Sequence, residues 1–353
     1  MEPERRDGGQ MIDLKINSAS RAEWDSYVLA HPDSTFAHLY GWKEVIRRSY
    51  GHEPFYLEAW DQGRLSGVLP LVQIKSRLFG RQMASMPYLD TGGCLADSIE
   101  ATRELVNAAR ELALRLRSEV VLRSTDPSDI GWQTSTGKVT MHMGLNPDPK
   151  ALLKSIPSER RNRIRKSENN GLNVGFIAPG EIERFYAVFS QNMKDLGSPV
   201  HSKRFFTEIL SAFGENAGLI AVNDSDGRTV GAGLYFRHRG VLSLPWVSCL
   251  RSAFKLNPNI SLYWKLIAWG CETGAEVFDF GRSTPGSGTF EFKRQWGAAP
   301  VQLYWRRFNP NGKITGELDS DSAKGRLMAS AWKKLPLCVA NTIGPALRKS
   351  ISL

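Results

Sequence analysis

Cysteine is scarce in this sequence. The 353 residues contain four, Cys94, Cys249, Cys271 and Cys338. No two form a C-x-x-C pair, so the spacing argues against a zinc or disulfide framework and is typical of a reduced intracellular protein. Long apolar runs are missing too, and the first residues, MEPERRDGGQMIDLKI, hold no apolar signal core. We therefore expect a soluble cytoplasmic protein with no metal site, no membrane span and no secretory signal.

Basic residues and aromatic residues are what the sequence has in quantity. Lysine and arginine number 46 against 36 acidic residues, which gives a formal net charge of +10, and ten tryptophans contribute to an aromatic content of 10%. The apolar content of 41% is enough for a dense core. The positive charge favours phosphates, nucleotides, nucleic acid or an anionic membrane face as partners, without selecting among them.

The same order of predicted elements occurs in both halves of the chain. The first half reads as strands at 11–16 and 54–76, helices at 21–30, 36–49 and 98–118, and a strand EVVLRS. The second half reads as helices at 181–197 and 202–214, a three-strand meander at 218–250, a helix at 259–274 and strands at 276–281 and 301–308. This is the order of an acetyltransferase-type α/β (α+β) domain. We predict two tandem domains at 11–150 and 151–310, each a mixed, largely antiparallel sheet flanked by helices, and a tail at 311–353.

The most informative segment is FDFGRSTPGSGTFEFKRQWG, residues 278–297. An apolar strand ends on Asp279 and Arg282, a Gly/Ser/Thr loop follows, and an aromatic segment carries Lys293 after Phe292. Such a strand end can present an acid and a cation to a substrate. It can equally hold a local ion pair between Asp279 and Arg282 that fixes the turn, with Lys293 as a solvated helix residue, and the residues alone leave these alternatives open.

Two basic segments are candidates for anion binding. SIPSERRNRIRKSENNGLNV, residues 155–174, is a predicted helix that carries Arg160 and Arg163 among five cations. It is either a solvated linker helix or a helix that binds a polyanion. The second interpretation is open because the planar fork of arginine suits phosphate. The loop RSAFKLNPN carries Arg251 and Lys255 before a helix, where a diphosphate could bind the helix N-terminus, but it is not glycine-rich.

Several stretches in order resemble the FemAB family, and more specifically the FemAB-like proteins associated with exosortase/PEP-CTERM exopolysaccharide systems. They are FAHLYGWKEVIRRSYGHEPFYLEAW, PYLDTGGCLAD, ERRNRIRKSENNGL, FYAVFSQNMKDLGSPVHSKRFF, LYWKLIAWGCETGAEVFDFGRSTPGSGTFEFKRQWGAAPVQLYW and WKKLPLCVANTIGPALRK. The similarity covers nearly the whole chain after about residue 11, and the DFGRS…GT-x-EFK-x-x-WG segment is its most specific part. Phe290 stands where relatives often have tyrosine.

The resemblance implies two tandem GNAT-type domains and transfer of an acyl group to an amine. The donor would be acyl-CoA or aminoacyl-tRNA, used as a co-substrate with no tightly bound cofactor. The acceptor would be a cell-envelope or exopolysaccharide precursor, phosphorylated or linked to a nucleotide or lipid. The lysine of the family's FK pair corresponds to Lys293, and we expect Asp279 and Arg282 beside it. For substrate binding we expect Trp42, Tyr88, Tyr263 and Phe292 in a cleft between the domains.

Two further readings stay open at this point. The chain could be a non-catalytic assembly protein of an exopolysaccharide system, or a protein that binds nucleic acid or another anion, tRNA included. The tail contains Pro336, Gly344 and Pro345, which argue against one continuous helix. We expect it to dock on the protein body or to touch the inner face of the membrane through its mixed basic and apolar residues.

Overall fold

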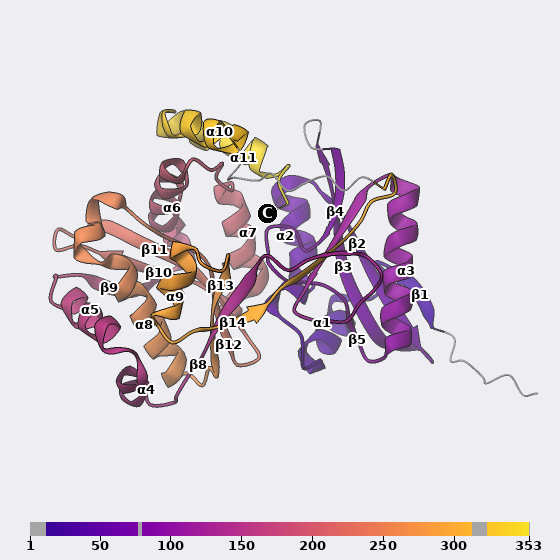
Figure 1. Cartoon of the computed structure of the whole chain (residues 1–353), viewed down its shortest axis with the longest axis horizontal. Coiled ribbons are helices and arrows are strands. Elements are labelled where there is room, and N and C mark those ends of the chain that lie inside the picture. The colour runs from indigo at the N-terminus through magenta and orange to yellow at the C-terminus, as the bar shows by residue number, and fades with distance from the viewer. Residues whose placement is uncertain (1–11, 77–79, 313–322, 353) are drawn as a thin grey trace, which may run out of the picture.

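The computed structural model describes residues 12–76, 80–312 and 323–352 (Figure 1). Two mixed sheets lie side by side, each flanked by helices, and the two C-terminal helices lie along one side of the pair. No helix in the described ranges is long and apolar enough to cross a membrane.

The first sheet has the strand order β1-β2-β3-β4-β6-β15-β7, with β5 paired to β3. All its neighbouring strands are antiparallel except β4 and β6. Its strands are β1 (Asp13–Ile16), β2 (Glu53–Asp61), β3 (Arg64–Ser76), β4 (Gly80–Ser85), β5 (Leu95–Ala96), β6 (Glu119–Ser124), β7 (Gln133–Ser135) and β15 (Tyr304–Phe308). The helices of this half are α1 (Arg21–Ala30), the 3-10 turn η1 (Phe36–His38), α2 (Gly41–Tyr50) and α3 (Ile99–Leu116).

The second sheet has the order β14-β8-β13-β12-β11-β10-β9. Only β12 and β13 run parallel in it. Its strands are β8 (Val139–Gly144), β9 (Asn173–Ile177), β10 (Ala217–Asn223), β11 (Thr229–His238), β12 (Val241–Cys249), β13 (Val277–Ser283) and β14 (Ala299–Gln302). The flanking elements are α4 (Pro149–Ser155), α5 (Ser158–Glu168), η2 (Pro179–Glu181), α6 (Ile182–Leu196), α7 (Lys203–Phe213), η3 (Gly214–Asn216), η4 (Arg251–Leu256), α8 (Pro258–Glu272) and α9 (Gly288–Arg294).

The two sheets exchange strands across the middle of the molecule. β8 precedes α4 in the chain but pairs with β13 and β14 of the second sheet, whereas β15 near the end of the chain pairs with β6 and β7 of the first. The expected single strand at 301–308 is therefore wrong. The chain changes sheet at Leu303, which is 1% exposed, so the same apolar run serves two sheets.

A second correction concerns the helix expected at 36–49. The structure splits it into η1 and α2, with Leu39 in an extended conformation between them. The break lets Trp42 pack into a core shared by both halves, where its ring lies 5.0 Å from Phe213 and 5.6 Å from Phe236. This aromatic contact between α2, α7 and β11 is one reason why the halves meet along a packed interface.

The C-terminal helices α10 (Ala323–Lys333) and α11 (Leu337–Arg348) lie against α6 (Figure 1). Pro336 separates them, so the prediction that one continuous helix does not form is correct, although Pro345 lies inside α11. Gly344 is in close contact with Val200, where a Cβ atom would lie 3.1 Å from the Val200 backbone nitrogen. The last described residues then cross onto the first half.

Candidate active site

A cleft opens between the two halves at the point where two parallel strands part. β12 and β13 pair only from Val241–Ser243 to Val277–Asp279, and beyond this point they separate. Pro245, which has no N–H to donate, follows in β12 at an irregularity in its pairing with β11. The opening has a volume of about 360 Å³ and is lined by both halves and by the tail, including Tyr88, Asp90, Thr140, His142, Ser243, Trp246, Asp279, Arg282 and Arg348.

Asp279 is the centre of a polar cluster on the second-sheet wall of this cleft. Its Oδ1 accepts hydrogen bonds from the Thr140 hydroxyl at 2.7 Å and from the Gly281 N–H at 2.8 Å. The Ser243 hydroxyl donates to its Oδ2 at 3.4 Å. His142 lies directly opposite on β8, with its Nε2 3.5 Å from Oδ1 and 35% of its side chain exposed. The carboxylate is thus fixed by several donors beside an accessible imidazole.

A bulge in β13 directs Asp279 and Arg282 into the cleft. The pairing register with β8 shifts between these two residues, and Gly281 within the bulge has a φ of +73°, a conformation that favours glycine. Lys293, from α9, lies behind the bulge and its Nζ donates to the carbonyls of Gly281 and Arg282, each at 2.8 Å. The side chain of Lys293 therefore fixes the bulge from behind.

Burial changes the acidity of Lys293. The residue is only 7% exposed, and this burial lowers the pKa of its ammonium from the usual 10.5 to about 8, although Asp279 and Asp90 act in the opposite direction. A neutral amine has two hydrogens to donate, which matches the two carbonyl acceptors. Lys293 can thus hold the bulge in either protonation state.

Arg282 joins the two halves rather than pairing within its own turn. Its Nη1 lies 3.1 Å from Oδ1 of Asp90, and its backbone N–H donates to Oδ2 of the same carboxylate at 3.3 Å. Its guanidinium also lies 5.2 Å from the ring of Trp305, whose indole N–H donates to the Asp90 carbonyl. The local ion pair between Asp279 and Arg282 that the sequence left open is thus replaced by a long-range one.

The first half contributes hydroxyl groups to the opposite wall. The Ser34 hydroxyl is hydrogen-bonded to Nε2 of His238 at 2.9 Å, and the Thr35 and Thr91 hydroxyls lie 3.1 Å apart. Burial lowers the pKa of His238 to about 4, so this imidazole is neutral at physiological pH. Tyr88, an expected substrate-binding residue, lines the cleft beside them.

Other expected site residues lie elsewhere. Trp42 and Tyr263 are core residues, and Tyr263 packs against Phe280 and Phe292. Arg160 is 1% exposed and lies between the rings of Phe292 and Trp296, at 4.8 and 5.0 Å. Tyr263, Phe292 and Arg160 pack around α9, and Trp42 lies in the core between α2, α7 and β11, so none of the four lines the cleft.

The remaining basic candidates are on the outer surface. Arg163 pairs with Glu159 one helical turn away at 3.0 Å. Arg251 donates to the Asp195 carbonyl at 3.1 Å, and Lys255 is exposed on η4. The structure therefore does not gather Arg160, Arg163, Arg251 and Lys255 into one site with the cleft.

Sequence reasoning missed His142, Thr140, Asp90 and Arg348. The first two lie on a short strand before the second half, and their only local signal is the alternation in KVTMHMG. Asp90 and Arg348 reach the cleft from 192 residues upstream and 66 residues downstream of Arg282, so only the fold unites them. Within the described residues, no group of three or more His, Cys, Asp or Glu side chains lies together as metal ligands would.

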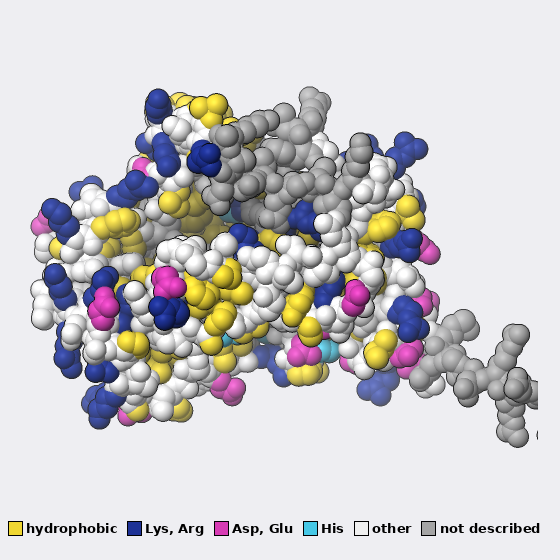
Figure 2. Space-filling view, viewed as in Figure 1, with side chains coloured by type: hydrophobic (Ala, Val, Ile, Leu, Met, Phe, Trp, Pro, Cys, Tyr) yellow, Lys and Arg dark blue, Asp and Glu magenta, His cyan; other side chains and the backbone are white. Residues whose placement is uncertain are grey.

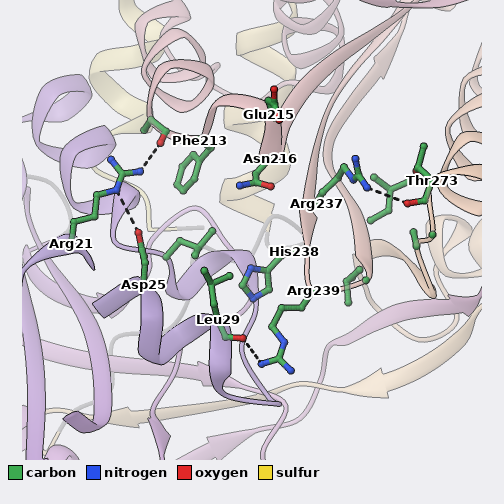
Figure 3. Close-up of a pocket in the computed structure, with 17 residues that line it drawn as sticks. Arg21, Asp25, Leu29, Phe213, Glu215, Asn216, Arg237, His238, Arg239 and Thr273 are labelled. Carbon is green, nitrogen blue, oxygen red and sulfur yellow. Dashed lines mark hydrogen bonds and ion pairs between the residues drawn. The ribbon is translucent and has the colours of Figure 1, made fainter. Parts of the chain in front are cut away.

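A neighbouring groove of about 400 Å³ lies on the other side of His238, between α1 and the turn that joins β11 to β12 (Figure 3). Its cations already have partners. Arg21 donates to the Ala212 carbonyl and lies 3.4 Å from Asp25, Arg237 donates to the Thr273 carbonyl, and Arg239 donates to the Leu29 carbonyl (Figure 3). The contacts of Arg21 with Ala212 and of Arg239 with Leu29 join the two halves, and we interpret the groove as structural.

Comparison with known proteins agrees with this fold. Residues 158–294 match the family model described as an acetyltransferase (GNAT) domain. No curated protein matches the chain. Among solved structures, FemX shares 15% identity with a TM-score of 0.68, over 84% of this chain and 98% of its own. A tandem GNAT protein from the clavulanic acid biosynthesis pathway shares 13% at 0.53, over 86% and 100%. L-PGS from Bacillus licheniformis shares 10% at 0.51, over 83% and 96%. The predicted fold of two tandem GNAT-like domains is confirmed.

Proposed function

We propose that this chain, a GNAT-type acyltransferase of FemAB-like fold, transfers an acyl or aminoacyl group to an amino group of a cell-envelope or exopolysaccharide precursor. The observation that carries the proposal is the Asp279–His142 pair at the parting of β12 and β13, inside a cleft that both halves line. Clefts between domains are common substrate sites, and this one brings a base and a cation together.

His142 is the base in this scheme. Asp279 already accepts from Thr140 and Gly281, so it is better placed to orient an imidazole than to take a proton itself. With the Nε2–H of His142 directed at Asp279, its Nδ1 is the acceptor for a proton of the substrate amine. The amine nitrogen attacks the donor carbonyl, the C–N bond forms, and the thioester C–S or ester C–O bond breaks. The leaving thiolate or alkoxide then takes up that proton from the His142 imidazolium, which returns His142 to its neutral form.

Arg282 and Lys293 have different roles in the proposal. The guanidinium of Arg282 lines the cleft, so we propose that it stabilises the negative charge that develops on the tetrahedral intermediate. Lys293 holds the carbonyls of the bulge and acts as a positioning residue. The burial of its amine behind the bulge favours this indirect role over direct contact of Lys293 with the oxyanion.

The donor is acyl-CoA or aminoacyl-tRNA. The GNAT domain match favours the thioester, and the resemblance of the sequence to FemAB proteins favours the tRNA ester. The unpaired side of β12 beyond Ser243 offers main-chain groups to a donor arm, and Arg251 and Lys255 lie on the loop that follows β12. Both residues are exposed, as contacts to a donor phosphate require.

The tail supports a peripheral position at the inner face of the membrane, where a lipid-linked acceptor would be presented. Leu327 and Met328 on α10 are 72% and 53% exposed, and apolar side chains gather on this helix in Figure 2. Lys333 and Lys334 are exposed next to them, a combination that suits an anionic interface. Co-sedimentation with liposomes of 30% anionic lipid should fall in a Leu327→Ser/Met328→Ser variant, and equal sedimentation of both proteins contradicts the idea.

Transfer itself is tested with purified protein, radiolabelled acyl-CoA or aminoacyl-tRNA, and an amino-sugar nucleotide or lipid-linked acceptor. We expect Asp279→Asn and His142→Gln each to lower kcat by about 10²–10³-fold, as loss of a general base does. Asp226→Asn, in the exposed turn between β10 and β11, is the matched control and should keep the wild-type rate. Donor binding with no transfer to any amine would instead favour the non-catalytic assembly role.

A further inference from the structure

Arg348, at the end of the tail helix α11, is a cleft residue that the proposed mechanism does not use. It lines the same opening as Arg282, Tyr88 and Trp246. The segment that carries it is fixed to both halves of the protein. α11 packs on α6 of the second half, and the Ser352 carbonyl accepts from the Tyr88 N–H at 2.8 Å on the first.

Hydrogen bonds from the first half hold the end of the tail in one place. The Lys349 carbonyl lies 2.8 Å from Nε2 of His52 and accepts from the Tyr88 hydroxyl at 2.9 Å. Arg123, 1% exposed, donates to the Ser352 carbonyl at 3.0 Å and to its hydroxyl at 3.2 Å. A tail that merely covered the surface would need none of these buried contacts.

The hydrogen-bond partners of Arg348 are neutral. Its Nε–H donates to Nε2 of His201 at 3.0 Å, so Nδ1 of His201 carries the proton and faces the Tyr50 hydroxyl at 2.7 Å. Burial keeps the pKa of His201 well below its usual value, so this partner has no charge. The Arg348 guanidinium also lies 5.4 Å from the ring of Tyr88. In the part of the chain that the structure describes, no carboxylate pairs with Arg348.

A half-buried guanidinium whose hydrogen-bond partners are all neutral can bind an anionic ligand that supplies the missing charge. Its neighbour in the cleft, Arg282, is already paired with Asp90. Among the described residues that line the cleft, Arg348 therefore carries the positive charge that is left for a substrate. Arginine binds phosphate through a planar fork of N–H donors.

We propose that Arg348 completes the substrate cleft from the C-terminal tail and binds a phosphate or diphosphate group of the substrate. This rests on the proposed function for the identity of the substrate, but the binding itself does not require transfer to occur. The phosphate can come from a nucleotide-linked glycan, a lipid-linked glycan or the acyl donor. The tail is thus part of the site and not an appendage.

Isothermal titration of the full chain with inorganic pyrophosphate tests the site. Arg348→Gln should weaken the affinity by about tenfold to a hundredfold, the usual effect of losing hydrogen bonds to a charged group, and Arg348→Lys should weaken it less, because a lysine keeps the charge without the fork. Lys349→Gln removes a neighbouring exposed charge and should leave the affinity unchanged. Unchanged affinity in a folded Arg348→Gln protein overturns the proposal.

Two measurements keep the outcome interpretable. If Arg348→Gln does not fold, Arg348→Lys decides, and wild-type pyrophosphate affinity in that variant overturns the site. Titrations with UDP-N-acetylglucosamine, geranyl diphosphate and CoA then identify the source of the phosphate. If Arg348→Gln loses pyrophosphate binding and the wild-type protein shows no measurable transfer, the proposed transferase activity is contradicted and the phosphate site is supported. Transfer with an unchanged KM for both the acceptor and the acyl donor in Arg348→Lys overturns the site alone.

Discussion

Replacement of Lys293 by methionine separates a positioning lysine from a surface one. In the wild-type protein, the amine satisfies two buried carbonyls, and burial lowers its pKa to about 8. Methionine fills a similar volume but offers no donor. The variant therefore loses two hydrogen bonds and, in exchange, avoids the burial of a cation, and the balance between these two effects depends on pH.

The sign of this dependence follows from linkage. The folded pKa lies below the unfolded value of about 10.5, so between these values the unfolded chain binds more protons and stability rises with pH. A shift of this size gives the wild-type protein about 2 kcal/mol more stability at pH 9.5 than at pH 7.5 from this one group. Below pH 8 that contribution is absent, because the amine is protonated in both states.

Urea unfolding of both proteins at pH 7.5, 8.5 and 9.5 measures the effect. The difference in unfolding free energy between wild type and Lys293→Met should grow by about 2 kcal/mol over this range. Lys265→Met, on the exposed face of α8, is the matched control and should show a constant difference. If the difference in unfolding free energy between wild type and Lys293→Met does not change with pH, the view that a buried amine holds the bulge is refuted. Lys293 would then behave as a solvent-exposed cation.

Three further substitutions test the surroundings of the cleft. Arg160→Met should lower the free energy of unfolding by about 2 kcal/mol in urea titrations, since it removes a buried, ring-stacked guanidinium, whereas Arg163→Met should change it by less than about 0.5 kcal/mol. Gly281→Ala should lower the free energy of unfolding by about 1–2 kcal/mol, because the φ of Gly281 is +73°, and it should also lower the transfer rate. Gly344→Val should cost about 1–3 kcal/mol by overpacking against Val200 and weaken pyrophosphate binding, and an unaltered affinity would show that the tail need not dock for the site to form.

Local patterns in the sequence were sufficient to predict most of the helices and strands and one wall of the cleft. The DFGRS segment predicted a strand that ends on an acid and an arginine, and Asp279 and Arg282 do line the cleft together. Its glycine and the following Ser/Thr loop are local features that any close reading finds. Tyr88, which the sequence analysis proposed for a cleft between the domains, also lines this cleft, although the loop that carries it is largely buried.

Ion pairs and hydrogen bonds between residues in distant segments could not be predicted from the sequence. Nothing in the local context of Arg282 distinguishes Asp279, three residues away, from Asp90, and the bulge at Gly281 decides between them. The basic helix shows the same limit. Its even distribution of cations left two interpretations open, and only the fold shows that Arg161 donates to the carbonyls of Lys154 and Ile156 at the end of α4.

Strand exchange explains why the site belongs to the whole chain. The segment that matches the GNAT domain, 158–294, contains Asp279, Arg282 and Lys293 but neither β8 nor the tail. A fragment with those bounds would lose His142, the proposed base, together with the strand that pairs along β13 and sets its bulge. It would also lose Asp90, so Arg282 would have no carboxylate to hold its direction. The second half therefore supplies the acid and the cation, and the segments on either side of it give those groups their orientation.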